Sequence, residues 1–141
     1  MQEPQKQERN ALKAYGIQKH FTYDNCHREI PLFWKNTEEY RRSIGLTGAF
    51  GICIMHEDGI DYIIADPCKG NDPLPEECVL WTCEASHWYI FHKEGPCTQA
   101  IQSLEQEVTE TWMPEHQEDT GSVWIEVYAS MPDIQLWIKA E

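Results

Sequence analysis

The feature that most constrains the fold is one order of segments that occurs twice along the 141 residues. Each half reads as a strand, a helix and two further strands. The segments are 16–23, 30–44, 50–55 and 60–65 in the first half, and 86–92, 97–112, 123–129 and 134–139 in the second. A sheet with one helix over a face, present twice, predicts an α+β fold. We expect an antiparallel sheet with two main helices in a pseudo-twofold arrangement, with a cleft at the seam.

Both helices are predicted from apolar side chains spaced three and four residues apart. The first has Pro31 in its first turn and ends at Gly45, where glycine suits the backbone that closes many helices. The second begins after Gly95 and ends before Pro114. Three glutamates fall off its apolar stripe and are expected to face solvent: Glu105, Glu107 and Glu110.

The ends of the chain suggest how it is organised. Residues 1–13 are polar and mixed in charge, so we expect a flexible N-terminal leader there and one domain over residues 14–141. A further short strand is expected over 79–84, and a turn over 130–132 joins the last two strands. Because we find neither a signal peptide nor a membrane span, we expect a cytoplasmic protein with no membrane partner and reduced cysteines.

Charge is distributed unevenly. The chain has 11 basic and 24 acidic residues, for a formal net charge of −13, and residues 71–141 hold two of the basic and fourteen of the acidic ones. Such a chain repels a phosphate backbone, so direct binding to nucleic acid is not expected. The acidic half attracts cations, unless its carboxylates only keep the surface solvated. Cysteines and histidines lack the paired spacing of zinc ligands, so neither a metal nor a cofactor is expected.

One carboxylate lies where solvation does not explain it. Side chains alternate between the two faces of a strand, so Glu126 shares a face with Trp124 and Tyr128. Either this face is wet, or it forms an aromatic pocket with one carboxylate at its floor, which suits an organic cation. Further aromatic side chains either line such a pocket or fill the core: Trp34, Tyr62, Tyr89, Phe91 and Trp112. The alternation leaves open whether Trp88, or Tyr89 with Phe91, faces the seam.

Several segments together carry a resemblance to a known family. They are GIQKHFTYDNCHREIPLFW at 16–34, WYIFHKEG at 88–95, WMP at 112–114, and IEVY at 125–128 before a last strand ending in LWI at 136–138. Over residues 14–140 the chain resembles the GyrI-like effector-binding domain, the ligand-sensing part of bacterial multidrug-responsive AraC- and MerR-type regulators. It is most similar to the stand-alone members on integron gene cassettes, which bind cationic drugs.

The resemblance implies the same doubled fold and a small-molecule binding role linked to transcription regulation or drug response. The ligands it implies are amphipathic organic cations. In the family, a buried glutamate meets the cation, and this residue falls on Glu126, with Tyr128 and Trp34 lining the site. Trp112 and Pro114 fall on positions whose role is more structural than ligand-contacting.

The resemblance also leaves alternatives open. No helix-turn-helix precedes the domain, and thirteen polar residues cannot form one, so we expect either a separate transcription regulator as partner or simple sequestration of the ligand. A homodimer is also left open. We expect a binding protein rather than an enzyme. The alternatives are a hydrolase of reactive small molecules, with Glu126 as base and Tyr128 as proton donor, and an interaction protein that protects gyrase.

Overall fold

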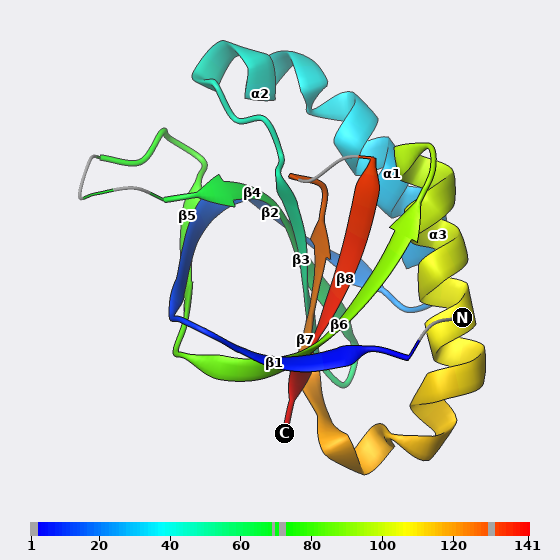
Figure 1. Ribbon diagram of the computed structural model, residues 1–141. Helices are drawn as coiled ribbons and strands as arrows, with labels where there is room; N and C mark the ends of the chain where they lie inside the picture. The colour runs from blue at the N-terminus through cyan, green and yellow to red at the C-terminus, as the bar shows by residue number, and fades with distance from the viewer. Residues whose placement is uncertain (1–2, 69, 71–72, 130–131) are drawn as a thin grey trace.

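The computed structural model describes residues 3–68, 70, 73–129 and 132–141, without the side chains of residues 97 and 98. Its described part is one antiparallel sheet of eight strands with helices over one face (Figure 1). The strands are β1 (Gln5–Arg9), β2 (Leu12–Thr22), β3 (Phe50–Met55), β4 (Gly59–Pro67), β5 (Val79–Cys83), β6 (Ser86–Glu94), β7 (Thr120–Val127) and β8 (Asp133–Ala140). The helices are α1 (Cys26–Asn36), α2 (Glu38–Ile44) and α3 (Cys97–Glu107). No helix in this part of the chain is long and apolar enough to cross a membrane.

The strand order confirms the predicted duplication. Across the sheet it is β1-β6-β8-β7-β3-β4-β2-β5, with β7 and β3 paired at the centre of the repeat. From that pair, β3-β4-β2 runs outward on one side and β7-β8-β6 on the other. Each half therefore has the same strand arrangement, and the α+β fold in pseudo-twofold arrangement is confirmed.

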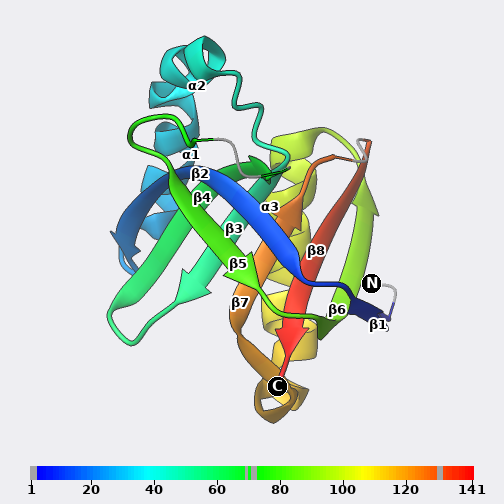
Figure 2. The same ribbon diagram turned by 90° about the vertical axis from the view of Figure 1, so that its left-hand side faces the viewer.

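Each half also contributes an edge strand to the other half. β1 precedes β2 in the chain but pairs with β6, while β5 precedes β6 but pairs with β2. Only residues 10 and 11 separate β1 from β2, so the sheet must curl until its two edges lie near each other (Figures 1 and 2). Residues 5–13, expected to belong to a flexible leader, instead form β1 and the start of β2. The pattern missed β1 because an edge strand exposed along much of its length needs no apolar run.

The helices differ from the prediction at their boundaries. The first predicted helix is divided into α1 and α2 at Thr37, whose hydroxyl donates to the carbonyl of Phe33 at 2.7 Å. α1 begins at Cys26, so Pro31 lies inside the helix rather than in its first turn. Gly45, at φ 74°, ends α2 as predicted. After α3 the chain continues helically through η1 (Val108–Trp112), η2 (Met113–Glu115) and η3 (Gln117–Asp119). The expected turn at 130–132 lies largely outside the described residues.

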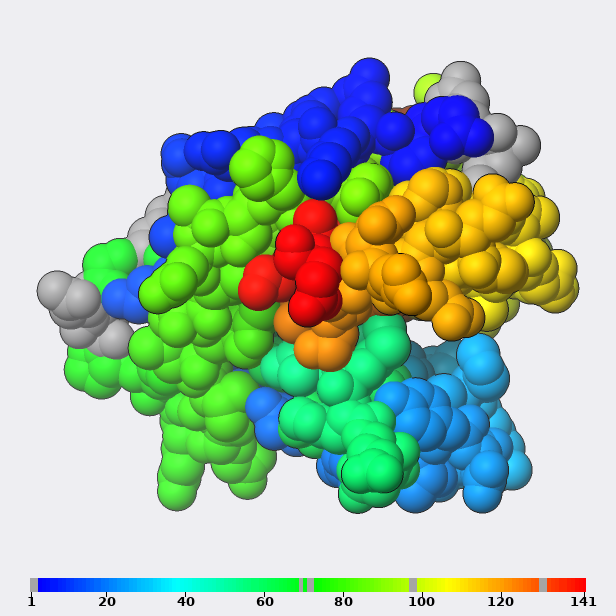
Figure 3. All heavy atoms as spheres, turned by 90° about the horizontal axis from the view of Figure 1, so that it is seen from below, coloured from blue at the N-terminus to red at the C-terminus, as the bar shows by residue number. Residues whose placement is uncertain are grey.

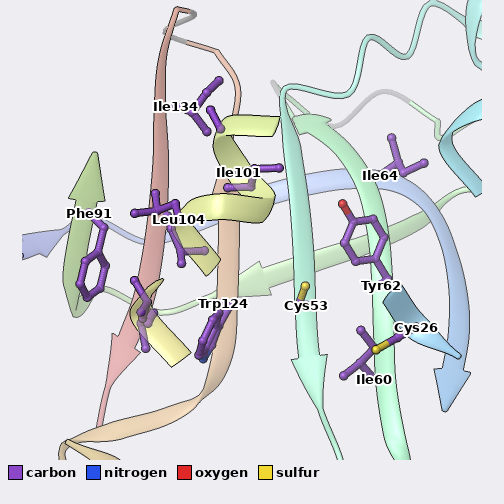
Figure 4. Packing of buried hydrophobic residues seen from close by; sticks show 14 of the residues in the cluster. Cys26, Cys53, Ile60, Tyr62, Ile64, Phe91, Ile101, Leu104, Trp124 and Ile134 are labelled. Atoms are coloured by element: carbon purple, nitrogen blue, oxygen red, sulfur yellow. The ribbon is translucent and has the colours of Figure 1, made fainter. Parts of the chain in front are cut away.

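Two apolar clusters occupy the two faces of the sheet. On the helix side, α1 packs against β2 and β4, and α3 packs against β6 and β8. Figure 4 shows Tyr62, Cys53 and Trp124 on this side together with Leu104 of α3. The cluster on the other face includes Ile125 and Val127. The aliphatic face of β7 therefore packs on the side of the sheet away from the helices. The opposite face of β7, which carries Trp124 and Glu126, lies on the helix side of the sheet.

Candidate functional site

Glu126 lies on β7, at the seam between the two halves and on the helix side of the sheet. It is only 5% exposed. The residue opposite it on β3 is Gly51. A Cβ atom at this position would collide with the hydroxyl of Tyr62 and with Oε1 of Glu126, so the glycine provides the space that these two groups occupy.

Two tyrosines hold the Glu126 carboxylate. The hydroxyl of Tyr62, on β4, donates to Oε1 at 2.5 Å, and the hydroxyl of Tyr128 donates to the same oxygen at 2.8 Å. The indole Nε1 of Trp34, on α1, donates to the Tyr62 hydroxyl at 2.9 Å. Hydrogen bonds to an ionised acceptor are strong, and donors in series polarise one another. This network allows a carboxylate to remain buried.

A second carboxyl group approaches from α3. The side chain of Glu105 hydrogen bonds to that of Glu126. We expected Glu105 to face solvent, and that was wrong. The sequence did contain the signal, because Ile101, Glu105, Val108 and Trp112 are spaced four, three and four residues apart, as on one helix face.

The other two glutamates of this region lie at the surface. Glu107 accepts a hydrogen bond from the Lys93 ammonium group at 2.7 Å. Glu110 is exposed, as expected. Of the three glutamates taken for solvated side chains, Glu105 alone belongs to the interior site.

Burial dominates the electrostatics of the carboxyl pair. It raises the pKa of Glu126, and hydrogen bonds from Glu105, Tyr62 and Tyr128 partly offset this rise. Burial, together with the charge of Glu126, raises the pKa of Glu105 well above its usual range. Within the described residues, no lysine or arginine pairs with either glutamate. Both carboxyl groups therefore lie in an apolar setting that disfavours their ionised forms.

The aromatic rings next to Glu126 come mainly from the first half of the chain. Trp34 packs edge-on against Tyr128, with ring centroids 5.7 Å apart, and against Tyr62 at 6.4 Å. Gly48 has φ 83°, and a Cβ there would lie 2.7 Å from the Trp34 ring. Behind the same ring, the Arg41 guanidinium lies 5.1 Å from its centroid and donates to the Trp34 carbonyl at 2.9 Å. The indole is thus fixed from two sides.

A second aromatic group lies under α3 and η1. The ring of Trp112 is 4.9 Å from Tyr89 and 5.1 Å from Phe91, measured between centroids, and His116 stacks on it at 4.1 Å. The open question about β6 is thereby answered, because Tyr89 and Phe91 face the helix side. Trp88 packs on the opposite face.

The structure brings the predicted site residues to one face but into two groups. All the aromatic candidates belong to the helix-side cluster or pack against it. Trp34, Tyr62 and Tyr128 join the hydrogen-bond network of Glu126, whereas Tyr89, Phe91 and Trp112 form the separate ring group. Trp124 is buried on β7, on the same strand face as Glu126. In the space-filling view from below, a narrow hollow separates the atoms of α1, in blue, from those of α3 and the turns after it, in yellow to orange (Figure 3).

Among the described residues, no group of three or more histidine, cysteine, aspartate or glutamate side chains has a geometry that could hold a metal ion. The five cysteines whose side chains are described are free thiols. Burial raises the pKa of Cys53, beside the carboxyl pair, well above its usual range, and so keeps the thiol protonated.

Comparisons with known proteins agree on the family and the fold. The family model for Cass2, an integron-associated effector binding protein, matches residues 7–138. The structure of SAV2435 bound to tetraphenylphosphonium is similar, with a TM-score of 0.84 and 19% identity, covering 99% of this chain and 94% of that one. An integron cassette protein from Vibrio cholerae has a TM-score of 0.78 and 18% identity, covering 99% and 97%.

A protein from Staphylococcus aureus described as a bacterial transcription regulation protein also has a TM-score of 0.78 and 18% identity, with 99% and 98% covered. No functionally curated protein matches the chain in sequence. The structural similarities show the fold, and the family model, which spans nearly the whole chain, shows the family. The chain belongs to the integron-associated effector-binding proteins, the group that its sequence resembles most.

Proposed function

We propose that this effector-binding protein takes up amphipathic organic cations at the seam, with Glu126 as the counter-charge. The observation that carries the proposal is a carboxylate that is 5% exposed, held by two tyrosine hydroxyls and paired with no basic side chain of the described residues. Burying such a charge is unfavourable for folding unless a cation compensates it. A glutamine would serve a purely structural role at lower cost, so the charge itself is the functional element.

The rings around the carboxylate suit the apolar part of such a ligand. Trp34 and Tyr128 stand edge to face beside Glu126, and aromatic faces attract cations by about 0.5–2 kcal/mol each. We propose that Trp34, Tyr62 and Tyr128 form one wall of the site. The facing wall consists of Trp124, Tyr89, Phe91 and Trp112.

The comparisons support this ligand class. Tetraphenylphosphonium, bound in the structure of SAV2435, is a single positive charge surrounded by four phenyl rings. Membership of an effector-binding family favours binding over catalysis. We further propose that binding is linked to transcription regulation or drug response, either through a separate regulator or by sequestering the ligand in the cytoplasm.

Titration of Glu126→Gln with tetraphenylphosphonium tests the proposal. The substitution removes the charge and keeps the shape, so we expect affinity to fall at least about tenfold, as measured by tryptophan quenching and calorimetry. Glu110→Gln is the matched control, because it makes the same change of net charge at an exposed position and should leave affinity within about twofold. Equal affinities of Glu126→Gln and the wild type would refute the role of Glu126.

A further inference from the structure

Two carboxyl groups in hydrogen-bond contact must share a proton. A carboxylate has no donor, so the bond between Glu105 and Glu126 requires that one of them be protonated. Glu126 already accepts from Tyr62 and Tyr128 through Oε1. If Glu126 is ionised and Glu105 is protonated, Glu105 becomes the third hydrogen-bond donor to Glu126. The two carboxyl groups and the two tyrosine hydroxyls then all have hydrogen-bond partners.

The surroundings keep the pair in this state. The titratable groups that face it are Tyr62 on β4, Tyr128 on β7, Cys53 on β3 and Cys26 on α1. Burial raises the pKa of Tyr62 and that of Cys53 well above their usual ranges. The Tyr62 hydroxyl and the Cys53 thiol therefore stay neutral beside the pair. With one shared proton, the two carboxyl groups together carry one negative charge.

We propose that Glu105 determines the charge specificity of the site, because its protonated carboxyl limits the pair to one negative charge and so matches a singly charged organic cation. This inference rests on the proposed function. A monocation neutralises Glu126 while the Glu105 proton stays in place. A doubly charged ligand requires the second carboxylate as well, so the O–H bond of Glu105 must break and its proton pass to the buffer as the ligand binds.

Two flat ligands of nearly the same shape distinguish these cases. N-methyl-4-phenylpyridinium carries one positive charge, and N,N′-dimethyl-4,4′-bipyridinium carries two. Calorimetry of the wild type in phosphate and in Tris, which differ in ionisation enthalpy, gives the number of protons released on binding. We expect the monocation to release fewer than about half a proton per site, and the dication to release about one. The affinity for the dication should then rise up to about tenfold per pH unit between about pH 6 and 8.

Glu105→Gln provides the second measurement. Glutamine resembles the protonated acid in shape but cannot ionise, so the substitution should weaken binding of the dication much more than binding of the monocation. The affinity for the dication should fall at least about tenfold and lose its proton release, since no second carboxylate is then available. The proton counts on the wild type test the inference even if this variant does not fold.

The outcomes separate this inference from the proposed function. Proton release by the monocation, dication binding without release, or equal weakening of both ligands in Glu105→Gln would overturn the inference. Absence of dication binding even at about pH 9 would do the same, while tetraphenylphosphonium binding would still support the proposed function. If the wild type bound none of the three cations, the proposed function itself would fail.

Discussion

Gly51→Ala tests the packing around Glu126 directly. Gly51 lies opposite Glu126 on the neighbouring strand, with a backbone conformation that is open to alanine. The added methyl group would collide with the Tyr62 hydroxyl and with Oε1 of Glu126. Neither the fold nor the net charge changes, so any effect reports on the space that the tyrosine and the carboxylate share.

The structure gives the size of the expected effect. Tyr62 must move, which breaks its 2.5 Å hydrogen bond to Glu126 and strains the 2.9 Å bond from Trp34. Forcing a methyl group into a packed interior costs about 1–3 kcal/mol. Losing a hydrogen bond to a charged group costs about 1.5–3 kcal/mol. Allowing for relaxation, we expect a loss of about 3 kcal/mol, and hence a fall in Tm of about 10 °C.

Thermal unfolding and tetraphenylphosphonium titration of four variants would check this: Gly51→Ala, Gly121→Ala, Tyr62→Phe, and Tyr62→Phe combined with Gly51→Ala. Gly121→Ala is the matched control on β7, where the nearest atom to a new Cβ lies at an ordinary 3.7 Å, and its stability should change by less than about 1 kcal/mol. Tyr62→Phe combined with Gly51→Ala removes the colliding hydroxyl and should cost at least about 1 kcal/mol less than the sum of the two single changes. The reasoning is refuted if Gly51→Ala keeps both its Tm and its ligand affinity, or if the two changes add.

Three further predictions concern the same site. Trp34→Phe removes the indole donor to Tyr62, so the free energy of unfolding should fall by about 1 kcal/mol in chemical denaturation, and an unchanged value would exclude a role for this bond. The raised pKa values of Glu105 and Glu126 favour folding while both groups are protonated, so the stability of the ligand-free protein should decline as the pH rises from about 5 to 9. Glu105→Gln should flatten this decline in Tm, and a stability that increased over this range in the wild type would contradict the sign. The Cys53 thiol is buried with a raised pKa, so under native conditions it should react with a disulfide reagent at least about 100-fold more slowly than in denaturant, as followed by mass spectrometry; equal rates would contradict its burial.

Local patterns in the sequence predicted much of the fold. Gly45 marked the end of α2, because this position needs a left-handed backbone that glycine adopts easily. Glu126 could be placed on a face with Trp124 and Tyr128, since alternation along a strand is a geometric necessity. β1 was missed because an edge strand can be polar on both faces.

The contacts that form the site could not be predicted from local sequence patterns. Tyr62 and Glu126 are 64 residues apart in the chain, and they meet only because β3 lies between their strands with a glycine at the crossing point. That arrangement depends on the order of the whole sheet, which local spacing does not determine. The inward position of Glu105 could have been predicted, because its spacing from Ile101 and Val108 places it on the same helix face as these apolar residues. We expected it to face solvent because that is the usual location of a glutamate side chain.

The exchange of β1 and β5 between the halves limits how the protein can respond to a ligand. The halves are joined at the seam by β3 and β7, and again at both outer edges by the exchanged strands. They cannot open and close like the two lobes of a hinged clamp, because either motion would break backbone pairing in several places at once. Ligands of different shape must therefore be accommodated by side-chain rotation and by small shifts of α1 and α3 over a rigid sheet. Any signal to a partner would travel through these helices rather than through a change in the angle between the halves.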